Sequence, residues 1–289
     1  MSVQRPLIEV EENAMKIDLH CHSNLSDGEL SPQQLVRYAG EQGIEMLAIT
    51  DHDLAEPLPE ANAAADALAI QLVPGIELSA NWGNVAVHVL GLNINPVSAA
   101  LGPIVERQAA AREQRALEIG ERLAKLNIQD SYQGAKAQAG TSRIGRPHFA
   151  RFLVESGVVK DVKTAYKKYL GAGKVGDVKT HWPAMEEAVQ WVHQVEGYAV
   201  LAHPAKYNLT RRKLDRLCED FKEAGGDGLE LVSGMQTADI TAYHHRLCEK
   251  YELYASCGSD FHGPVSSWHD LGKMAPVPGA CRMIWECWA

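Results

Sequence analysis

The chain has 289 residues with a formal charge of −9, and 46% of them are hydrophobic and 22% charged. This composition is ordinary for a globular protein and excludes a disordered or fibrous chain, and no apolar run approaches the ~18 residues of a membrane span. The first residues lack the basic-then-apolar pattern of a signal peptide, so we expect a cytoplasmic protein with no membrane partner.

The first expected element is a strand that ends at His20 and His22. A helix over 31–43 follows, with Ser31 as N-cap, Pro32 at its first position and Gln34 completing a capping box. The remaining expected strands lie within 44–53, 70–79, 84–94, 197–204, 225–234 and 251–263, and the remaining helices cover 59–69, 98–126, 211–224 and 239–251. This alternation predicts an α/β fold, a barrel with a helical insertion.

Three parts are expected along the chain: an N-terminal tail over 1–14, a barrel domain over 15–97 and 181–289, and a basic helical insertion, or cap domain, over 98–180. The insertion contains 15 Lys and Arg against 8 Asp and Glu, although the whole chain is acidic. Its positive charge suits an anionic partner, and long helices also need a charged exterior in water. Both interpretations stay open at this point.

Nine side chains of the kinds that bind metals lie at or near the ends of the expected strands. Two residues apart on a strand, His20 and His22 point to the same face, whereas Cys21 points away. The carboxyl ends of barrel strands converge on one mouth, so distant residues meet there. Each residue alone could be structural, but nine at corresponding positions favour a metal centre. The candidates are His20, His22, Asp27, His52, Glu77, His88, His203, Asp260 and His262.

Six imidazoles and three carboxylates exceed what one ion can use, so we expect two or three divalent ions. Manganese is the expected metal, with iron or zinc as alternatives. Such a cluster keeps a net positive charge and attracts a phosphate dianion. Clustered ions also lower the pKa of a bridging water, so a metal-bridging hydroxide is the expected nucleophile at phosphorus.

Six segments, "DLHCHSNLSDG", "AITDHD", "GIELS", "VHVLG", "LAHP" and "GSDFHG", together resemble the PHP (polymerase and histidinol phosphatase) superfamily. The resemblance implies a distorted (β/α)7 barrel with a trinuclear metal centre. It also implies a division of the ligands in which Glu77 bridges two ions. One ion takes His20, His22, Glu77 and Asp260, a second takes Glu77, His88 and His203, and a third takes Asp27, His52 and His262.

Within the superfamily, the motif order and the basic insertion are most similar to the bacterial RNase AM, or 3′,5′-nucleoside bisphosphate phosphatase, family. The resemblance implies hydrolysis of the 3′-phosphate ester of 5′-phosphorylated nucleotides. A 3′,5′-bisphosphate such as pAp would yield AMP and phosphate, and 5′-phosphorylated RNA would lose a nucleotide from its 5′ end. Phosphatase and 5′→3′ exoribonuclease are then one reaction. No obligatory protein partner is implied.

The insertion contains an R-x-x-R-x-H pattern formed by Arg143, Arg146 and His148. Guanidinium groups bind phosphate through two parallel hydrogen bonds, so this pattern predicts a clamp for the 5′-phosphate. The alternative is a loop with ordinary surface arginines. The proton donor to the leaving group stays open between His52, His148 and a metal-bound water.

Two other functions remain in consideration. The first is a small-molecule phosphatase such as histidinol-phosphate phosphatase. The basic insertion argues against it, because it favours a substrate with more than one phosphate. The second is a non-catalytic metal-binding module, as PHP domains can be within DNA polymerases. A degenerate module would be expected to have lost ligands, and every ligand position in this sequence carries a suitable residue.

Overall fold

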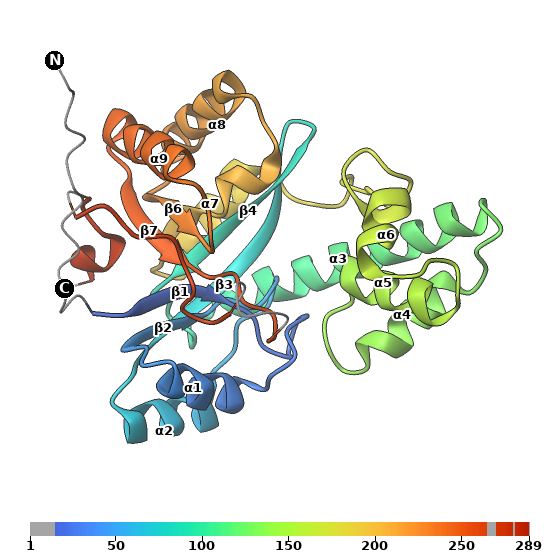
Figure 1. Cartoon of the computed structure of the whole chain (residues 1–289), viewed down its shortest axis with the longest axis horizontal. Coiled ribbons are helices and arrows are strands. Elements are labelled where there is room, and N and C mark those ends of the chain that lie inside the picture. Colours follow the sequence, from blue (N-terminus) through green and yellow to red (C-terminus); the bar gives the residue numbers. More distant parts are fainter. Residues whose placement is uncertain (1–14, 265–269, 280, 289) are drawn as a thin grey trace, which may run out of the picture.

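Seven strands follow one another around a single sheet in chain order (Figure 1). The computed structural model describes residues 15–264, 270–279 and 281–288, so the expected tail over 1–14 lies outside the described residues. The strands are β1 (Ile17–Cys21), β2 (Met46–Ile49), β3 (Gln71–Trp82), β4 (Val85–Leu92), β5 (Tyr198–Leu201), β6 (Gly228–Ser233) and β7 (Tyr254–Gly258).

The sheet closes on itself through the backbone that follows β7. The His22 N–H donates to the Phe261 carbonyl (2.8 Å), and the Asp260 N–H donates to the His20 carbonyl (2.8 Å). This nearly closed, seven-stranded barrel confirms the predicted α/β fold.

One hairpin interrupts the strand-helix alternation. Strand β4 runs antiparallel to both β3 and β5. The pairs β1–β2, β2–β3, β5–β6 and β6–β7 are parallel. A short turn joins β3 to β4 and contains Gly83, whose φ of 54° lies in the left-handed region. An antiparallel pair needs only such a turn, whereas a parallel pair needs a longer crossover.

Helices pack around the barrel and bury their apolar faces against it. The predicted capping box is present: the Gln34 N–H donates to Ser31 Oγ (3.3 Å) and the Ser31 N–H donates to Gln34 Oε1 (2.9 Å). The elements of this layer are α1 (Pro32–Glu41), α2 (Pro59–Leu68), α7 (Met185–Gln194), α8 (Arg211–Glu223) and α9 (Ala238–Tyr251), with 3₁₀ helices η2 (Pro204–Tyr207) and η3 (Ile284–Cys287). No helix in the described part of the chain is long and apolar enough to cross a bilayer.

The remaining helices form a lobe beside the barrel (Figure 1). They are α3 (Leu101–Ala124), α4 (Ser131–Ala139), α5 (Arg146–Glu155), α6 (Val162–Ala165) and the π-helix η1 (Tyr166–Leu170). The lobe has its own apolar core, which includes Leu123, Phe149 and Leu153. Helix α3 begins in the barrel core, where Leu101 and Ile104 are buried. Because α3 contributes to both cores, the predicted domain division at residues 98 and 180 stays a prediction.

Candidate metal centre

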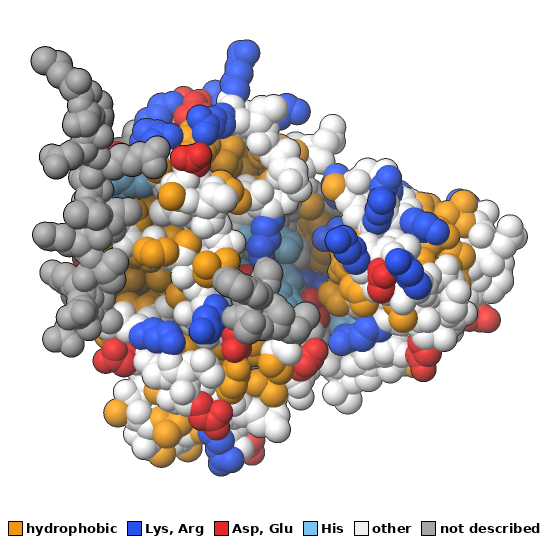
Figure 2. Space-filling view, viewed as in Figure 1, with side chains coloured by type: hydrophobic (Ala, Val, Ile, Leu, Met, Phe, Trp, Pro, Cys, Tyr) orange, Lys and Arg blue, Asp and Glu red, His pale blue; other side chains and the backbone are white. Residues whose placement is uncertain are grey.

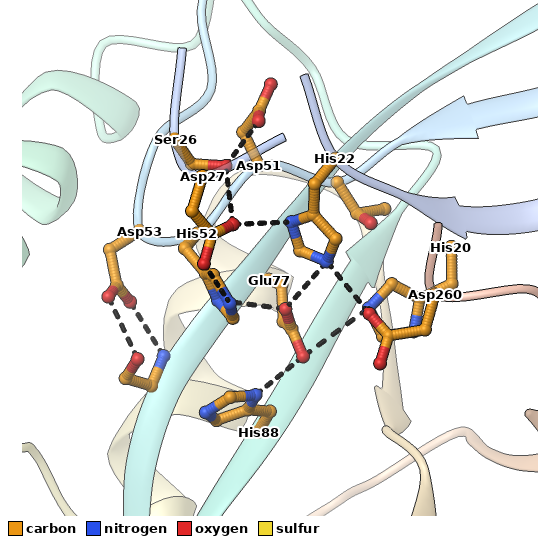
Figure 3. Close-up of polar contacts among 12 residues, drawn as sticks. His20, His22, Ser26, Asp27, Asp51, His52, Asp53, Glu77, His88 and Asp260 are labelled. Carbon is orange, nitrogen blue, oxygen red and sulfur yellow. Dashed lines mark hydrogen bonds and ion pairs between the residues drawn. The ribbon is translucent and has the colours of Figure 1, made fainter. Parts of the chain in front are cut away.

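The nine predicted ligands come together at one mouth of the barrel, and Figure 3 shows most of them pointing toward Glu77. The sequence pattern placed Glu77 at the end of its strand, but β3 continues to Trp82, so Glu77 lies within the strand. On β4, His88 lies opposite Ser79 of β3. Both ligands therefore come from strand interiors, because the β3–β4 hairpin extends beyond the barrel mouth.

Glu77 is fully buried at the centre of the cluster. Its Oε1 lies 2.6 Å from His88 Nδ1 and 2.9 Å from His203 Nε2. Its Oε2 lies 2.9 Å from His52 Nδ1 and 3.3 Å from His22 Nε2. The two oxygens thus face different imidazoles, which is the arrangement that a bridging carboxylate requires.

Two further carboxylates lie on either side of His22. Asp260 Oδ1 is 3.2 Å from His22 Nε2 and 3.4 Å from His20 Nε2. Asp27 Oδ1 is 3.3 Å from His262 Nε2 and 3.9 Å from His22 Nδ1. The His22 ring therefore stands between two carboxylates, each of which also faces another imidazole.

The donor set fits divalent metal ions. Several buried ring nitrogens, including His20 Nε2 and His203 Nδ1, have no hydrogen bond of good geometry among the described residues. Buried polar atoms rarely remain without a partner, and nitrogen and carboxylate donors at this spacing suit divalent cations. Four groups have ligand atoms within 4.8 Å of one another: His22, Asp27, His52 and His262; His20, Glu77 and His203; His20, His22 and Asp260; and His52, Glu77 and His88.

The electrostatics of the cluster favour ionised carboxylates. Burial opposes ionisation of Glu77, but the imidazoles of His52, His88 and His20 hold its pKa well below its usual range. Burial, with repulsion from His262 and His52, lowers the pKa of His22 to about 3. A neutral imidazole beside an ionised carboxylate is the state in which both groups can coordinate a metal.

His262 differs from His22 in its protonation. Burial works against its charged form, but the carboxylate of Asp27, and then that of Asp260, raises the pKa of His262 to about 10. A cation that binds through this ring must therefore displace a proton.

A second layer of buried groups orients the predicted ligands. Glu230 has no exposed surface; its Oε1 lies 3.1 Å from His20 Nδ1, and its Oε2 accepts a hydrogen bond from the His203 N–H. The His203 φ of 29° lies in a region that residues other than glycine rarely adopt, so this hydrogen bond helps to hold an unfavourable backbone. The sequence pattern missed Glu230, although one carboxylate in the apolar strand "GLELVS" was a usable signal.

A cleft of about 540 Å³ opens between the barrel mouth and the lobe. Its barrel side contains seven of the predicted ligands: Asp27, His52, Glu77, His88, His203, Asp260 and His262. Its lobe side carries Arg112, Arg115 and Arg146, and Asp177, Lys179 and Trp182 also line it. Figure 2 shows basic side chains around a hollow in which histidines are visible. The cleft thus has the predicted metal ligands on one side and basic side chains on the other.

The structure separates the three residues of the predicted clamp. Only Arg146 lines the cleft, whereas Arg143 lines a neighbouring cavity of about 350 Å³, because its N–H is bonded to the Leu25 carbonyl (3.2 Å). His148 is 1% exposed, and its Nδ1 accepts a hydrogen bond from the Gly145 N–H (3.0 Å) at the start of α5. Burial and the nearby Arg151 lower the pKa of His148 to about 4. The three residues of the R-x-x-R-x-H pattern therefore do not line one cavity.

Sequence reasoning missed four cations of the cleft: Arg112, Arg115, Lys179 and Lys206. Arg115, which is 7% exposed, donates from Nε to the Val178 carbonyl (2.8 Å). Lys206, on η2, contacts the Asp260 carboxylate. No local pattern pointed to Arg115, because a basic residue on a long helix fits a solvated face equally well.

Comparisons with known proteins agree with this geometry. A family model described as PHP domain matches residues 18–225. A 5′-3′ exoribonuclease of Haemophilus influenzae is 41% identical over 94% of this chain and 98% of its own length. A 3′,5′-nucleoside bisphosphate phosphatase of Chromobacterium violaceum is 40% identical over 93% of this chain and 95% of its own length.

Two solved structures share the fold. One, described as an amidohydrolase from Chromobacterium violaceum with bound SO4 and no metal, has a TM-score of 0.86 and 40% identity, and the match covers 94% of this chain and 95% of that one. Another, assigned as a metal-dependent phosphoesterase of Bifidobacterium adolescentis, has a TM-score of 0.78 and 27% identity, with 92% and 94% covered. The barrel, the His and carboxylate cluster and these matches together confirm the resemblance seen in the motifs: the chain belongs to the PHP domain family.

Proposed function

We propose that this phosphoesterase hydrolyses the 3′-phosphate ester of nucleotides that also carry a 5′-phosphate. A 3′,5′-nucleoside bisphosphate such as pAp would give AMP and phosphate, and 5′-phosphorylated RNA would lose nucleoside 5′-monophosphates from its 5′ end. The names of the two relatives, an exoribonuclease and a bisphosphate phosphatase, support both forms of the reaction. A cytoplasmic location remains part of this proposal.

The observation that carries the proposal is the basic wall opposite the metal-ligand residues. Arg115 and Arg146 line the same cleft, and neither has a carboxylate within 4.0 Å among the described residues. Burial, followed by the positive charges of Arg146 and Arg112, lowers the pKa of Arg115 to about 9. A phosphate dianion between these side chains would relieve that repulsion and accept hydrogen bonds from both guanidinium groups. We therefore assign the 5′-phosphate to Arg115 and Arg146.

The 3′-phosphate then lies over the His and carboxylate cluster at the other side of the cleft. We propose that the cluster holds two or three divalent ions, with manganese as the main candidate and iron or zinc as alternatives. The proposed ligands are those of the sequence prediction: His20, His22, Asp27, His52, Glu77, His88, His203, Asp260 and His262. When bound, such ions supply an activated water and neutralise the charge that develops on the phosphoryl group.

His52 belongs to the ligand set in this proposal. Its Nδ1 lies 2.9 Å from Glu77 Oε2 and its Nε2 lies 3.8 Å from Asp27 Oδ2. Both ring nitrogens thus face carboxylates of the cluster, and a ring that coordinates an ion through a nitrogen cannot donate a proton from that nitrogen. We assign His52 to coordination in preference to proton donation.

Substitution of Arg146 by Ala tests the proposal. The loss of one charged contact typically costs ~1.5–3 kcal/mol, so kcat/KM for pAp and for 5′-phosphorylated RNA should fall roughly ten- to a hundredfold. Hydrolysis of p-nitrophenyl phosphate, which has no second phosphate, should change little. Arg143→Ala is the matched control, because Arg143 lies three residues away in the neighbouring cavity and should have little effect on pAp.

The wild-type enzyme separates this function from its alternatives. It should prefer pAp over 3′-AMP, and a 5′-phosphate over a 5′-hydroxyl on the same oligonucleotide. Equal rates for both members of each pair would contradict the proposal, and a preference for histidinol phosphate would establish the small-molecule phosphatase. Metal binding without hydrolysis of any of these esters would establish a non-catalytic module.

A further inference from the structure

Asp53 is a buried carboxylate that directly follows the predicted ligand His52 and has no exposed surface. Its φ of 53° lies in the left-handed region. Its carboxylate accepts hydrogen bonds from the N–H (2.7 Å) and Oγ (2.9 Å) of Ser79 on β3, and its own N–H donates to the Glu77 carbonyl (2.9 Å). Figure 3 shows Asp53 at the edge of the cluster, beside His52. Asp53 is therefore fixed to the two strand segments that carry His52 and Glu77.

The same carboxylate is bonded to helix α3 of the lobe. Gln108 Nε2 donates to Asp53 Oδ1 (2.8 Å). Arg112 donates from Nε to Asp53 Oδ2 (2.7 Å), and its Nη2 lies 2.6 Å from the same oxygen. Arg112 Nη1 donates to the Ile144 carbonyl (3.3 Å). Arg112 is 7% exposed, and each of its three nitrogens contacts a protein acceptor. Arg112 also lines the cleft, but the hydrogen bonds and ion pair of its guanidinium group connect parts of the chain.

Arg112 lies next to Arg115 and Arg146, the two residues that form the phosphate clamp of the proposed function. Arg115 follows it by three residues on α3 and so lies on the same side of the helix. Arg146 begins α5, two residues after Ile144, whose carbonyl accepts from Arg112. One buried ion pair thereby connects the segment carrying His52 to both halves of the clamp.

We propose that the Asp53–Arg112 pair positions the phosphate clamp relative to the metal centre, and that this spacing determines the preference for substrates with two phosphates. The inference rests on the proposed function. A bisphosphate is held at both ends, so a change in spacing misplaces its reacting phosphorus, and a displacement of ~1 Å can cost about a hundredfold in rate. A substrate held only at the metal centre is insensitive to this spacing.

Arg112→Lys tests the inference, because lysine keeps the positive charge facing Asp53 but loses the fork that also reaches Ile144. We expect kcat/KM for pAp to fall at least tenfold, whereas kcat/KM for 3′-AMP changes less than threefold. Binding of 5′-AMP, measured by calorimetry, should also change less than threefold, since this ligand needs the clamp alone. A loss of 5′-AMP affinity in proportion to the loss of pAp turnover would overturn the inference, because Arg112 would then act on the clamp itself.

Arg107→Lys is the matched control. Arg107 also lies on α3 and makes a two-pronged ion pair, with Nη1 2.6 Å and Nη2 3.0 Å from the carboxylate oxygens of Glu187 on α7. This exposed pair also attaches α3 to the barrel layer, but no clamp residue adjoins it. If Arg107→Lys lowers pAp turnover as much as Arg112→Lys, general attachment of the lobe explains the effect and the inference fails.

Asp53→Asn is the second variant, for use if Arg112→Lys does not fold. The amide keeps the shape of the side chain and an oxygen for the Ser79 N–H, but removes the charge that holds Arg112. The same selective loss of pAp turnover is expected, and an unchanged ratio of pAp to 3′-AMP turnover would overturn the inference. A wild-type enzyme without a preference for pAp would refute the proposed function itself, independently of either variant.

Discussion

At the scale of single residues, Glu77 connects the parts of the predicted metal centre, because its two oxygens face imidazoles from β4 and from the segments after β1, β2 and β5. Removal of its charge takes away the group that opposes repulsion among these imidazoles and the incoming cations. A substitution of Glu77 should therefore weaken the binding of more than one ion.

We expect Glu77→Gln to lose bound metal and to reduce pAp hydrolysis to the background rate. Glutamine keeps the size and one oxygen, so the loss would reflect charge and coordination in preference to packing. Elemental analysis after purification without chelator gives the metal content, and thermal unfolding in chelator compares the folds. A variant that retains the full wild-type metal content would contradict the bridging role of Glu77.

Glu230 acts one step further from the metals, through the orientation of His20. Outer partners of this kind typically contribute ~10–100-fold to metal affinity, so Glu230→Gln should lower the affinity by about that factor. Competition with a chelator of known affinity measures the change. Glu219→Gln, at an exposed site on α8, is the control and should leave the affinity unchanged.

At the scale of secondary-structure elements, the contact between β1 and β7 closes the barrel at the metal centre. Gly258 ends β7, and a Cβ at this position would lie 2.3 Å from His20 Cβ and 2.7 Å from His20 N. The β1 backbone cannot move away cheaply, because His20 and His22 are bonded to the segment after β7. Glycine is thus required here for close approach of two strands.

Gly258→Ala should therefore destabilise the protein by ~1–3 kcal/mol, as overpacking of a tight core does. It should also weaken metal binding, because the clash displaces His20. Urea unfolding in chelator measures stability separately from metal binding. Gly102→Ala, where a Cβ would meet nothing within 4 Å, is the control and should leave both properties close to those of the wild type.

The positions of the expected elements followed closely from local sequence signals, but helices α4 to α7 were not among them, and the antiparallel pairing of β4 was not expected either. The helix after Ser31 carries its N-cap, Pro32 and capping box within four residues, so the sequence located it well. The expected barrel took β3 and β4 as successive strands of a regular alternation, although the four residues between 70–79 and 84–94 are too few for a parallel crossover and so indicate an antiparallel pair. The hairpin, and with it the mid-strand position of Glu77, was consequently missed.

At the scale of the whole molecule, metal binding should stabilise the fold, because the ligands come from both ends of the barrel sequence. The free energy gained by a ligand that binds only the folded chain is RT ln(1 + [L]/Kd), about 2.7 kcal/mol at a hundredfold excess over Kd. Chelation should therefore lower Tm, and added Mn²⁺ should restore it. An unchanged Tm in scanning calorimetry would contradict binding at this centre.

This metal-dependent gain should increase with pH. The pKa of His262 is raised to about 10 by Asp27 and Asp260 against the effect of burial, so the metal-free fold keeps this proton at neutral pH. The protonated ring stabilises the metal-free fold, and this stabilisation is complete at pH values below the ordinary histidine pKa of about 6.5. It disappears only as the pH rises past the pKa that His262 has in the folded protein. Metal must displace the proton, so the rise in Tm with Mn²⁺ should be larger at about pH 8 than at about pH 6. A rise that is the same at both values would contradict proton displacement.

The sequence by itself determined the barrel and the set of candidate ligands, because most motifs place their metal-binding side chains at or just after a strand end, whereas Glu77 and His88 lie inside their strands. Periodicity fixed the face that His20 and His22 share, and the strand-end rule brought the other seven candidates toward one mouth. These inferences need only local geometry and a regular fold. The phosphate clamp could not be predicted in this way. Three basic residues close in sequence suggested one binding unit, but closeness in sequence does not place side chains in one cavity.

Only the tertiary structure decided which basic residues face the metals. Arg146 and Arg143 are three residues apart, but the first begins a helix and the second lies in the preceding turn, so they line different cavities. Arg115 reaches the cleft from another helix because Gln108 and Arg112 attach α3 to the buried Asp53. The angle of the lobe, and therefore the identity of the clamp, depends on contacts between residues more than fifty positions apart, which no local pattern in the sequence records.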